Sequence, residues 1–161
     1  DRPFFLFIGG GLGKREVEET IERHRPSNIV SLPYQPLDRI KYSLSAADVH
    51  LVAMGTEMVG IIHPCKVYGA MAIGRPILLL GPSPCHVSDI LERHGVGWAI
   101  EYGDVAGAVS TLREIAATDH QELAEMGERA RRVVASEFSK RKLLGDFCDV
   151  LESAWRQAPA A

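Results

Sequence analysis

The sequence lacks the features that would place the protein in a membrane, on nucleic acid or in an oxidising compartment. It has no apolar run near the roughly 20 residues of a membrane span, and its opening Asp1-Arg2-Pro3 does not predict a signal peptide. With 18 Lys+Arg against 21 Asp+Glu, its net charge of −3 offers nucleic acid no basic field. Its three cysteines are widely spaced and lack a metal-ligand pattern. We therefore expect a reducing, cytoplasmic compartment and no metal ion.

Short apolar runs alternate with helical patterns along the whole chain, which is typical of a parallel sheet joined by crossover helices. We predict strands near 4–9, 28–32, 49–54, 76–80 and 96–101 in one sheet, with helices on both faces. The first run has no polar alternation, so it is predicted as a central strand. Asp104 and Asp119 are expected to cap two of the later helices. The predicted fold class is α/β, a Rossmann-like doubly wound parallel sheet with C-terminal helices, in one domain over 1–161.

The most informative stretch is 63–80, which reads as a loop, a short helix and a buried strand. Pro64 suits the first helical position, Gly74 suits the left-handed position after the last turn, and Pro76 prevents continuation. The amides and the dipole of a helix N-terminus favour an anion, and Lys66 adds a cation there. This pattern predicts a phosphate site, although a capped structural helix has the same signature and is commoner.

The loops after the first four predicted strands form the expected ligand site. Ligands of doubly wound sheets bind beyond the carboxyl ends of the strands, so we expect these loops to converge on one rim. The loops are 9–14, 33–36, 55–64 and 81–84. His63 in the third loop is a candidate hydrogen-bond donor, although a loop histidine is more often only solvated.

The glycine-rich turn after the first strand matches neither of two familiar phosphate-binding motifs. In a dinucleotide fingerprint starting at Gly9, the third glycine would fall on Lys14, and no carboxylate ends the next strand. A P-loop would need Ser or Thr at Arg15 and a glycine at Ile8. Both motifs are therefore excluded.

Several motifs, taken in order, resemble the donor-binding half of a GT-B-fold glycosyltransferase of the large retaining family 4. They span about 4–151 and comprise the glycine turn, Asn28-Ile-Val-x-Leu-x-Tyr34, Ser45-Ala-Ala-Asp48, the block Pro64-Cys-Lys-Val-Tyr-Gly-Ala-Met-Ala-Ile-Gly-Arg-Pro76, and Ala130-Arg-x-Val133 with Phe138-Ser139. The resemblance implies a C-terminal GT-B domain that binds a nucleoside-diphosphate hexose, UDP- or GDP-linked. It also implies transfer with retention to a glycan or lipid-linked acceptor, without a metal or other cofactor.

The resemblance also implies which residues contact the donor. The implied contacts are Gly9, Gly10 and Gly11 at the donor backbone, Tyr34 and Gln35 near the nucleobase, Gly60 to His63 near the sugar, and the amides of Cys65 and Lys66 at the diphosphate. The catalytic residues are left unassigned. No membrane span is expected, and peripheral membrane contact of the full-length protein is left open.

Two positions depart from the family's pattern. The family usually carries two glutamates with seven residues between them, one near the sugar and one on the ribose hydroxyls. By register with the Met71–Pro76 block these positions are Ile61 and Gly69, neither of which bears a carboxylate. Gly69 stays in the predicted donor site by position, and Glu57 is the nearest upstream acid.

The resemblance also implies parts that these residues do not include. The family's donor half begins one strand and one helix earlier, and an N-terminal domain binds the acceptor. We therefore expect no transfer by residues 1–161 alone, because half a cleft cannot align two substrates. A catalytically inactive nucleotide-sugar-binding or scaffold module is the main alternative. The missing glutamates favour it, and the intact Lys66–Pro76 block opposes it. A sugar-nucleotide epimerase of similar fold is weaker, because no acid–base set is evident.

Overall fold

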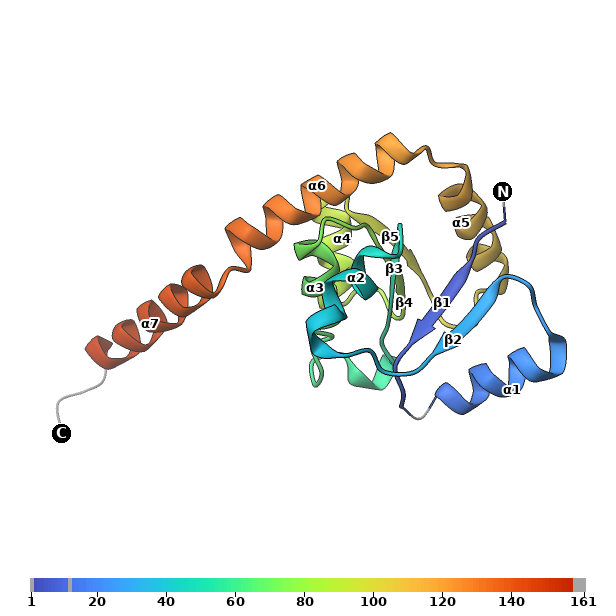
Figure 1. Ribbon diagram of the computed structural model, residues 1–161. Helices are drawn as coiled ribbons and strands as arrows, with labels where there is room; N and C mark the ends of the chain where they lie inside the picture. The colour runs from blue at the N-terminus through green and yellow to red at the C-terminus, as the bar shows by residue number, and fades with distance from the viewer. Residues whose placement is uncertain (1, 12, 158–161) are drawn as a thin grey trace.

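The computed structural model describes residues 2–11 and 13–157. Its strands and helices alternate along the first two thirds of the chain and end in three consecutive helices (Figure 1). The elements are β1 (Phe5–Ile8), α1 (Lys14–His24), β2 (Ile29–Leu32), η1 (Leu37–Arg39), α2 (Ile40–Ser45), β3 (His50–Ala53), η2 (Thr56–Met58), α3 (Lys66–Ala72), β4 (Ile77–Leu80), α4 (His86–His94), β5 (Gly97–Ile100), α5 (Val105–Ala117), α6 (His120–Glu137) and α7 (Lys140–Gln157). Each predicted strand is present, one or two residues shorter than expected.

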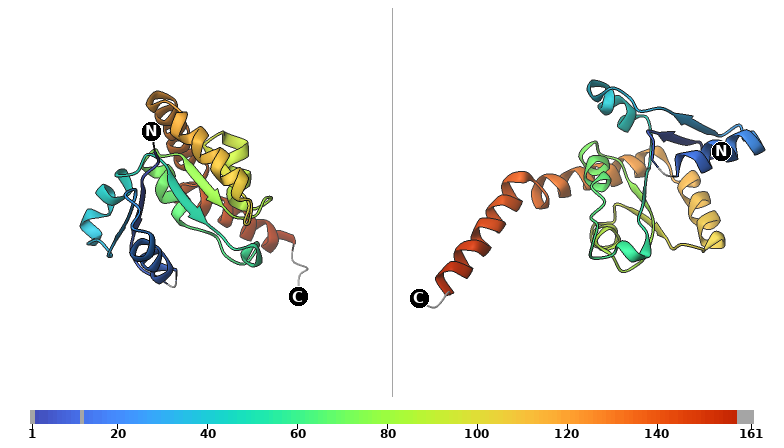
Figure 2. Two further views of the ribbon diagram at one scale, coloured as in Figure 1. Left: turned by 90° about the vertical axis from the view of Figure 1, so that its right-hand side faces the viewer. Right: turned by 90° about the horizontal axis from the view of Figure 1, so that it is seen from below.

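The strands pair in two separate sheets. β1 pairs with β2, and β4 pairs with β3 on one side and β5 on the other, with every pairing parallel. This arrangement confirms the α/β class with parallel sheets flanked by helices. The expectation of one continuous sheet is wrong, because no strand in the described residues pairs with the second edge of β1 or β3. Figure 2 shows β1 and β2 set apart from β3, β4 and β5.

The core of the molecule lies around β4. Ile77, Leu78 and Leu79 are all buried, which confirms the predicted strand covered on both faces. Side chains from α3, α4 and α6 complete this core; its buried members include Val67, Met71, Val87, Ile90, Leu91 and Ala130. By contrast, β1 is not the central strand that its apolar run predicts, because within residues 2–11 and 13–157 it pairs with β2 alone.

Local helix signals are satisfied as the sequence indicates. Gly74 follows α3 with φ +70, the left-handed conformation expected there. Asp104 accepts a hydrogen bond from the amide of Gly107 at 2.8 Å, and Asp119 accepts one from Glu122 at 2.8 Å. A reciprocal capping box forms instead at the start of α4, between Cys85 and the residue three positions on.

α7 projects away from the rest of the molecule (Figure 1). Its larger apolar side chains are all exposed: Leu143, Leu144, Phe147, Val150, Leu151 and Trp155. Among the described residues, no helix combines the length and the apolar character needed to cross a membrane.

Candidate functional site

The opening of α3 leaves two backbone amides without an acceptor among the described residues. α3 begins at Lys66, two residues after Pro64. A turn that leads into it is closed by hydrogen bonds from Val67 N to Pro64 O and from Tyr68 N to Cys65 O, each 3.2 Å. The amides of Cys65 and Lys66 precede these bonds and find no acceptor within the described residues. Both residues are exposed. Two free N–H groups and one ammonium are therefore available to an anion at this point.

The loop before α3 is shaped by Gly60, which has φ +77. The amides of Ile61 and Ile62 both donate to Met58 O, at 3.0 and 2.9 Å, and these bonds close a tight turn that contains Gly60. Ile61 is 77% exposed, so an apolar side chain faces solvent where the family carries its first glutamate. Gly69 lies inside α3, where a Cβ would meet only Leu44 of α2, at 4.0 Å.

A histidine–tyrosine–histidine cluster adjoins the first turn of α3. The Tyr68 hydroxyl is hydrogen-bonded to Nε2 of His63, and it lies 2.9 Å from Nε2 of His86 at the start of α4. The two imidazole rings also contact each other, with centroids 3.6 Å apart. Phe138 packs against the Tyr68 ring at 5.3 Å and meets the His86 ring edge-on at 6.4 Å.

The cluster changes the acid–base properties of two members. Burial raises the pKa of the Tyr68 hydroxyl above its ordinary value, and the nearby Cys65 thiol adds to the rise. Burial lowers the pKa of the His86 imidazole; His63 lowers it further, while Asp89 opposes the change. Both shifts favour the neutral forms of these two groups, the Tyr68 hydroxyl and the His86 imidazole.

A second group of predicted residues lies at the carboxyl ends of β1 and β2. The Tyr34 ring covers the glycine turn: a Cβ at Gly10 would lie 2.8 Å from its Cε2 atom, and one at Gly9 would lie 3.4 Å from Cε1. Gly9 and Gly11 have φ values of +120 and +121, which only glycine adopts readily. Gln35 folds back locally and donates from Nε2 to Pro33 O at 3.0 Å.

No family model matches the chain, but it is similar to several curated glycosyltransferases. It is 26% identical to a protein of Salmonella typhimurium named as the colanic acid biosynthesis glycosyltransferase WcaL, over 92% of this chain and 37% of that protein. It is 27% identical to a protein of Pseudomonas aeruginosa named as the glycosyltransferase WbjE, over 91% and 36% of the two chains. The chain thus spans little more than a third of the length of these relatives.

Solved structures show the same kind of fold. Sucrose-phosphate synthase of Thermosynechococcus elongatus matches with a TM-score of 0.70 and 16% identity, over 95% of this chain and 39% of that one. WaaG, described as a glycosyltransferase involved in lipopolysaccharide biosynthesis, matches with a TM-score of 0.60 and 16% identity, over 83% and 34%. The chain is similar in sequence and in fold to the C-terminal domain of GT-B glycosyltransferases. This finding confirms the resemblance that its motifs indicate.

The predicted donor residues of this GT-B-type domain fall into two groups rather than on one continuous rim. The group formed by the glycine turn and Tyr34 belongs to the β1–β2 sheet, and the group around α3 belongs to the β3–β5 sheet. Within the described residues no hydrogen bond or ring contact joins the two groups. The sheets are set apart (Figure 2), and this separation divides the predicted rim.

The sequence identifies His63 but gives no sign that Tyr68 and His86 belong with it. The available signal is positional: Tyr68 lies in the first turn of the helix that His63 precedes, and His86 begins the helix after the 81–84 loop. Recognising the cluster requires knowing that α3 and α4 begin side by side.

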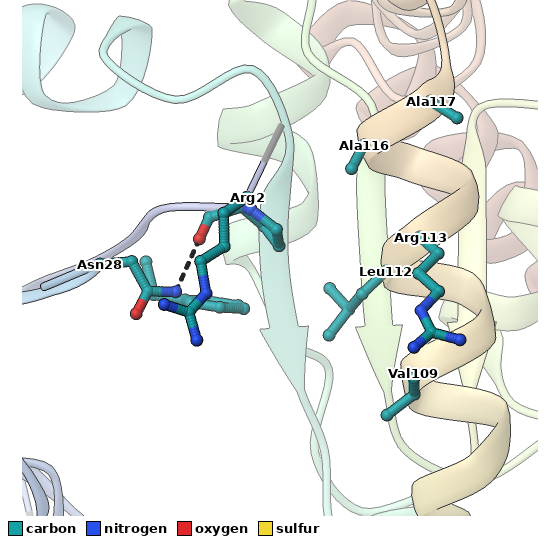
Figure 3. A pocket seen from close by; sticks show the side chains of 9 residues that line it. Arg2, Asn28, Val109, Leu112, Arg113, Ala116 and Ala117 are labelled. Atoms are coloured by element: carbon teal, nitrogen blue, oxygen red, sulfur yellow. Dashed lines mark hydrogen bonds between the residues drawn. The ribbon is translucent and has the colours of Figure 1, made fainter. Parts of the chain in front are cut away.

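A cavity that faces α5 is lined by residues of neither group (Figure 3). It measures about 600 Å³ and is lined on one side by Arg2, Pro3, Phe5 and Asn28 and on the other by Val109, Leu112, Arg113, Ala116 and Ala117. It adjoins the amino ends of β1 and β2, whereas doubly wound sheets bind ligands at the carboxyl ends. It is therefore not the candidate donor site.

Proposed function

We propose that this domain binds the nucleoside-diphosphate part of a UDP- or GDP-linked hexose, for transfer of the hexose with retention to a glycan or lipid-linked acceptor. One observation carries the proposal: the backbone amides of Cys65 and Lys66 have no acceptor among the described residues at the start of α3, and Lys66 itself carries an ammonium group. A diphosphate is the part of such a donor that needs N–H groups and a cation. The two N–H groups and the Lys66 ammonium would together neutralise the negative charge of the diphosphate without a metal ion.

The second group of residues suits the nucleoside. Tyr34 is 77% exposed, and its ring is seated on the glycine turn by the close approach of Gly9 and Gly10. A ring held on one side and open on the other is a stacking surface for a nucleobase. Gly60 to His63 would then lie near the sugar, as the family resemblance implies.

The strand order supports a proposal about the rest of the protein. In the doubly wound strand order 3-2-1-4-5-6, β2 would be strand 3, β1 would be strand 2, and β3, β4 and β5 would be strands 4, 5 and 6. We infer that a further strand–helix unit supplies strand 1, which lies between β1 and β3 and joins the two sheets. We also infer that an N-terminal acceptor domain completes the cleft. The greater length of the relatives is consistent with both. Residues 1–161 are then the donor-binding domain, with the cytoplasm as its expected compartment.

The diphosphate site is tested by Lys66→Ala with UDP, GDP and ADP as probes in isothermal titration. Removing one charge-assisted hydrogen bond should weaken binding of the preferred nucleotide by about 1–2 kcal/mol, roughly 5- to 30-fold in Kd. Lys142→Ala is the matched control, since Lys142 pairs with Asp146 on the projecting helix α7. Equal affinity of Lys66→Ala and the parent would refute the assignment.

A second candidate function is a catalytically inactive donor-binding module. The exposed Ile61 side chain and the Gly69 backbone favour it, because neither can supply the carboxylates that the family uses there. Transfer of labelled hexose by the full-length protein separates the two functions. Binding without transfer, over every donor that binds, would establish the inactive module.

A further inference from the structure

The His63–Tyr68–His86 cluster ties three separate elements to one hydroxyl group. His63 comes from the loop before α3, Tyr68 from the first turn of α3, and His86 from the first turn of α4. Phe138, at the end of α6, backs the Tyr68 and His86 rings. The Tyr68 and Phe138 rings also pack against the hydrophobic core. That packing does not explain why the Tyr68 hydroxyl meets two imidazoles. Such a convergence of polar groups at a candidate ligand site calls for a chemical role.

The hydrogen bonds restrict where the protons of the cluster lie. A tyrosine hydroxyl has one proton, so between two neutral imidazoles it donates to one Nε2 and accepts from the other. One histidine must therefore carry its proton on Nδ1 and the other on Nε2. The raised pKa of Tyr68 and the lowered pKa of His86 keep these two groups neutral, as this pattern requires.

We propose that Tyr68 and His86 are positioning residues that hold His63 in the Nδ1–H form beside the opening of α3. His86 donates its Nε2–H to the Tyr68 oxygen, and Tyr68 donates its proton to Nε2 of His63. The Nδ1–H of His63 is thereby left as a fixed donor for an oxygen of the donor's diphosphate or sugar. This role rests on the diphosphate site proposed above, because an anion at the Cys65 and Lys66 amides is what makes a donor favourable here.

Tyr68→Phe is the decisive variant. Its ring can still pack against Phe138, so the fold should survive, while both hydrogen bonds are lost. We expect the Kd for the preferred nucleoside diphosphate to rise about three- to tenfold. Tyr102→Phe, an exposed tyrosine after β5, is the matched control and should bind as the parent does.

Two further measurements distinguish positioning from a general structural effect. Imidazole ¹⁵N shifts should show Nδ1–H on His63 and Nε2–H on His86 in the nucleotide complex of the parent, and mixed forms of His63 in Tyr68→Phe. His86→Gln should retain most of the affinity, because its amide N–H can replace the Nε2–H donor, whereas His86→Leu should lose it. The six histidines of the chain allow assignment by single substitutions.

The outcomes separate this role from the donor site itself. If Lys66→Ala weakens binding but Tyr68→Phe binds as the parent does, the positioning role is overturned and the diphosphate site stands. Finding Nε2–H on His63 in the parent complex also overturns it. If the parent binds none of UDP, GDP and ADP, the diphosphate site falls and the positioning role falls with it.

Discussion

The two sheets of this domain are built from similar apolar runs but reach very different degrees of burial. In the three-stranded sheet Val52, Ile77 and Leu79 are at most 1% exposed. In the two-stranded sheet Phe7 is 39% exposed, and four other apolar side chains of β1 and β2 are similarly open. β4 has a strand on each edge and helices packed against it, whereas β1 pairs with one strand in the part of the chain that the structure describes. Burial here depends on neighbours, and apolar composition alone does not secure it.

The same contrast separates the two groups of candidate donor residues. The opening of α3 and the His63–Tyr68–His86 cluster adjoin the sheet of β3, β4 and β5, so their positions are fixed by packed helices. The glycine turn and Tyr34 rest on the more open sheet. We expect the diphosphate part of the site to be better organised in this chain than the nucleobase part.

The largest expected effect is a difference in the free energy of unfolding between two variants, each of which removes one large side chain from one of the two sheets. Leu79→Ala should cost about 3–5 kcal/mol of unfolding free energy, because it leaves a cavity in the buried sheet. Phe7→Ala should cost about 1–2 kcal/mol, because the ring is already partly in water. Urea unfolding of both variants measures the difference. Equal costs would show that β1 and β2 are as well packed in solution as β4.

A pair of glycine substitutions, one beside each sheet, tests the same difference in packing by adding a methyl group instead of removing a side chain. A Cβ at Gly127 in α6 would lie 1.9 Å from the carbonyl oxygen of Gly74, so Gly127→Ala must move one helix. We expect a loss of about 1–3 kcal/mol. Gly13→Ala, just before α1, places its methyl in open space at an ordinary φ of −76 and should change stability by less than about 0.5 kcal/mol.

Thermal or urea unfolding measured side by side tests the glycine pair. A neutral Gly127→Ala would mean that α6 can slide away from the end of α3 at little cost. The close approach of these helices would then not hold the core in place.

The sequence predicts the local elements of this domain well, because each depends on residues close together in the chain. The capping aspartates Asp104 and Asp119, the left-handed Gly74 and the buried run 77–80 all belong to this class. The division into two sheets could not be predicted, since the run 4–8 has the same composition whether one strand or two lie beside it. Edge neighbours are a property of the whole assembly of strands.

The candidate site shows the same limit. The opening of α3 could be predicted because Pro64, Lys66 and Gly74 mark a single helix. The cluster could not, because His86 is 18 residues beyond Tyr68 and meets it only through the packing of α4 beside α3. Ile61 illustrates the opposite case. The register of the sequence predicts that the family's first glutamate is missing at this position, and the structure shows that the isoleucine side chain there is exposed.

The smallest expected effect is a pH dependence of stability that comes from His86. Its folded-state pKa lies below the ordinary value of 6.5, mainly through burial. Between that lowered pKa and 6.5 the unfolded chain binds more protons than the native one, so the free energy of unfolding falls as the pH drops through this window. His86→Gln cannot titrate, so it should lose less stability than the parent between pH 7.5 and pH 5.5. Urea unfolding at these two pH values measures the difference.

The comparison isolates His86 because the other nearby charges are common to both proteins. His63 and Asp89 flank His86 in the parent and are unchanged in the variant. His94, 3.5 Å from Glu137, is also unchanged in the variant. An identical loss of stability in the parent and in His86→Gln would mean that the imidazole is hydrated in solution as freely as in the unfolded chain. The neutral state of His86 beside the Tyr68 hydroxyl would then lose its physical basis, because a protonated His86 would no longer be disfavoured at that position.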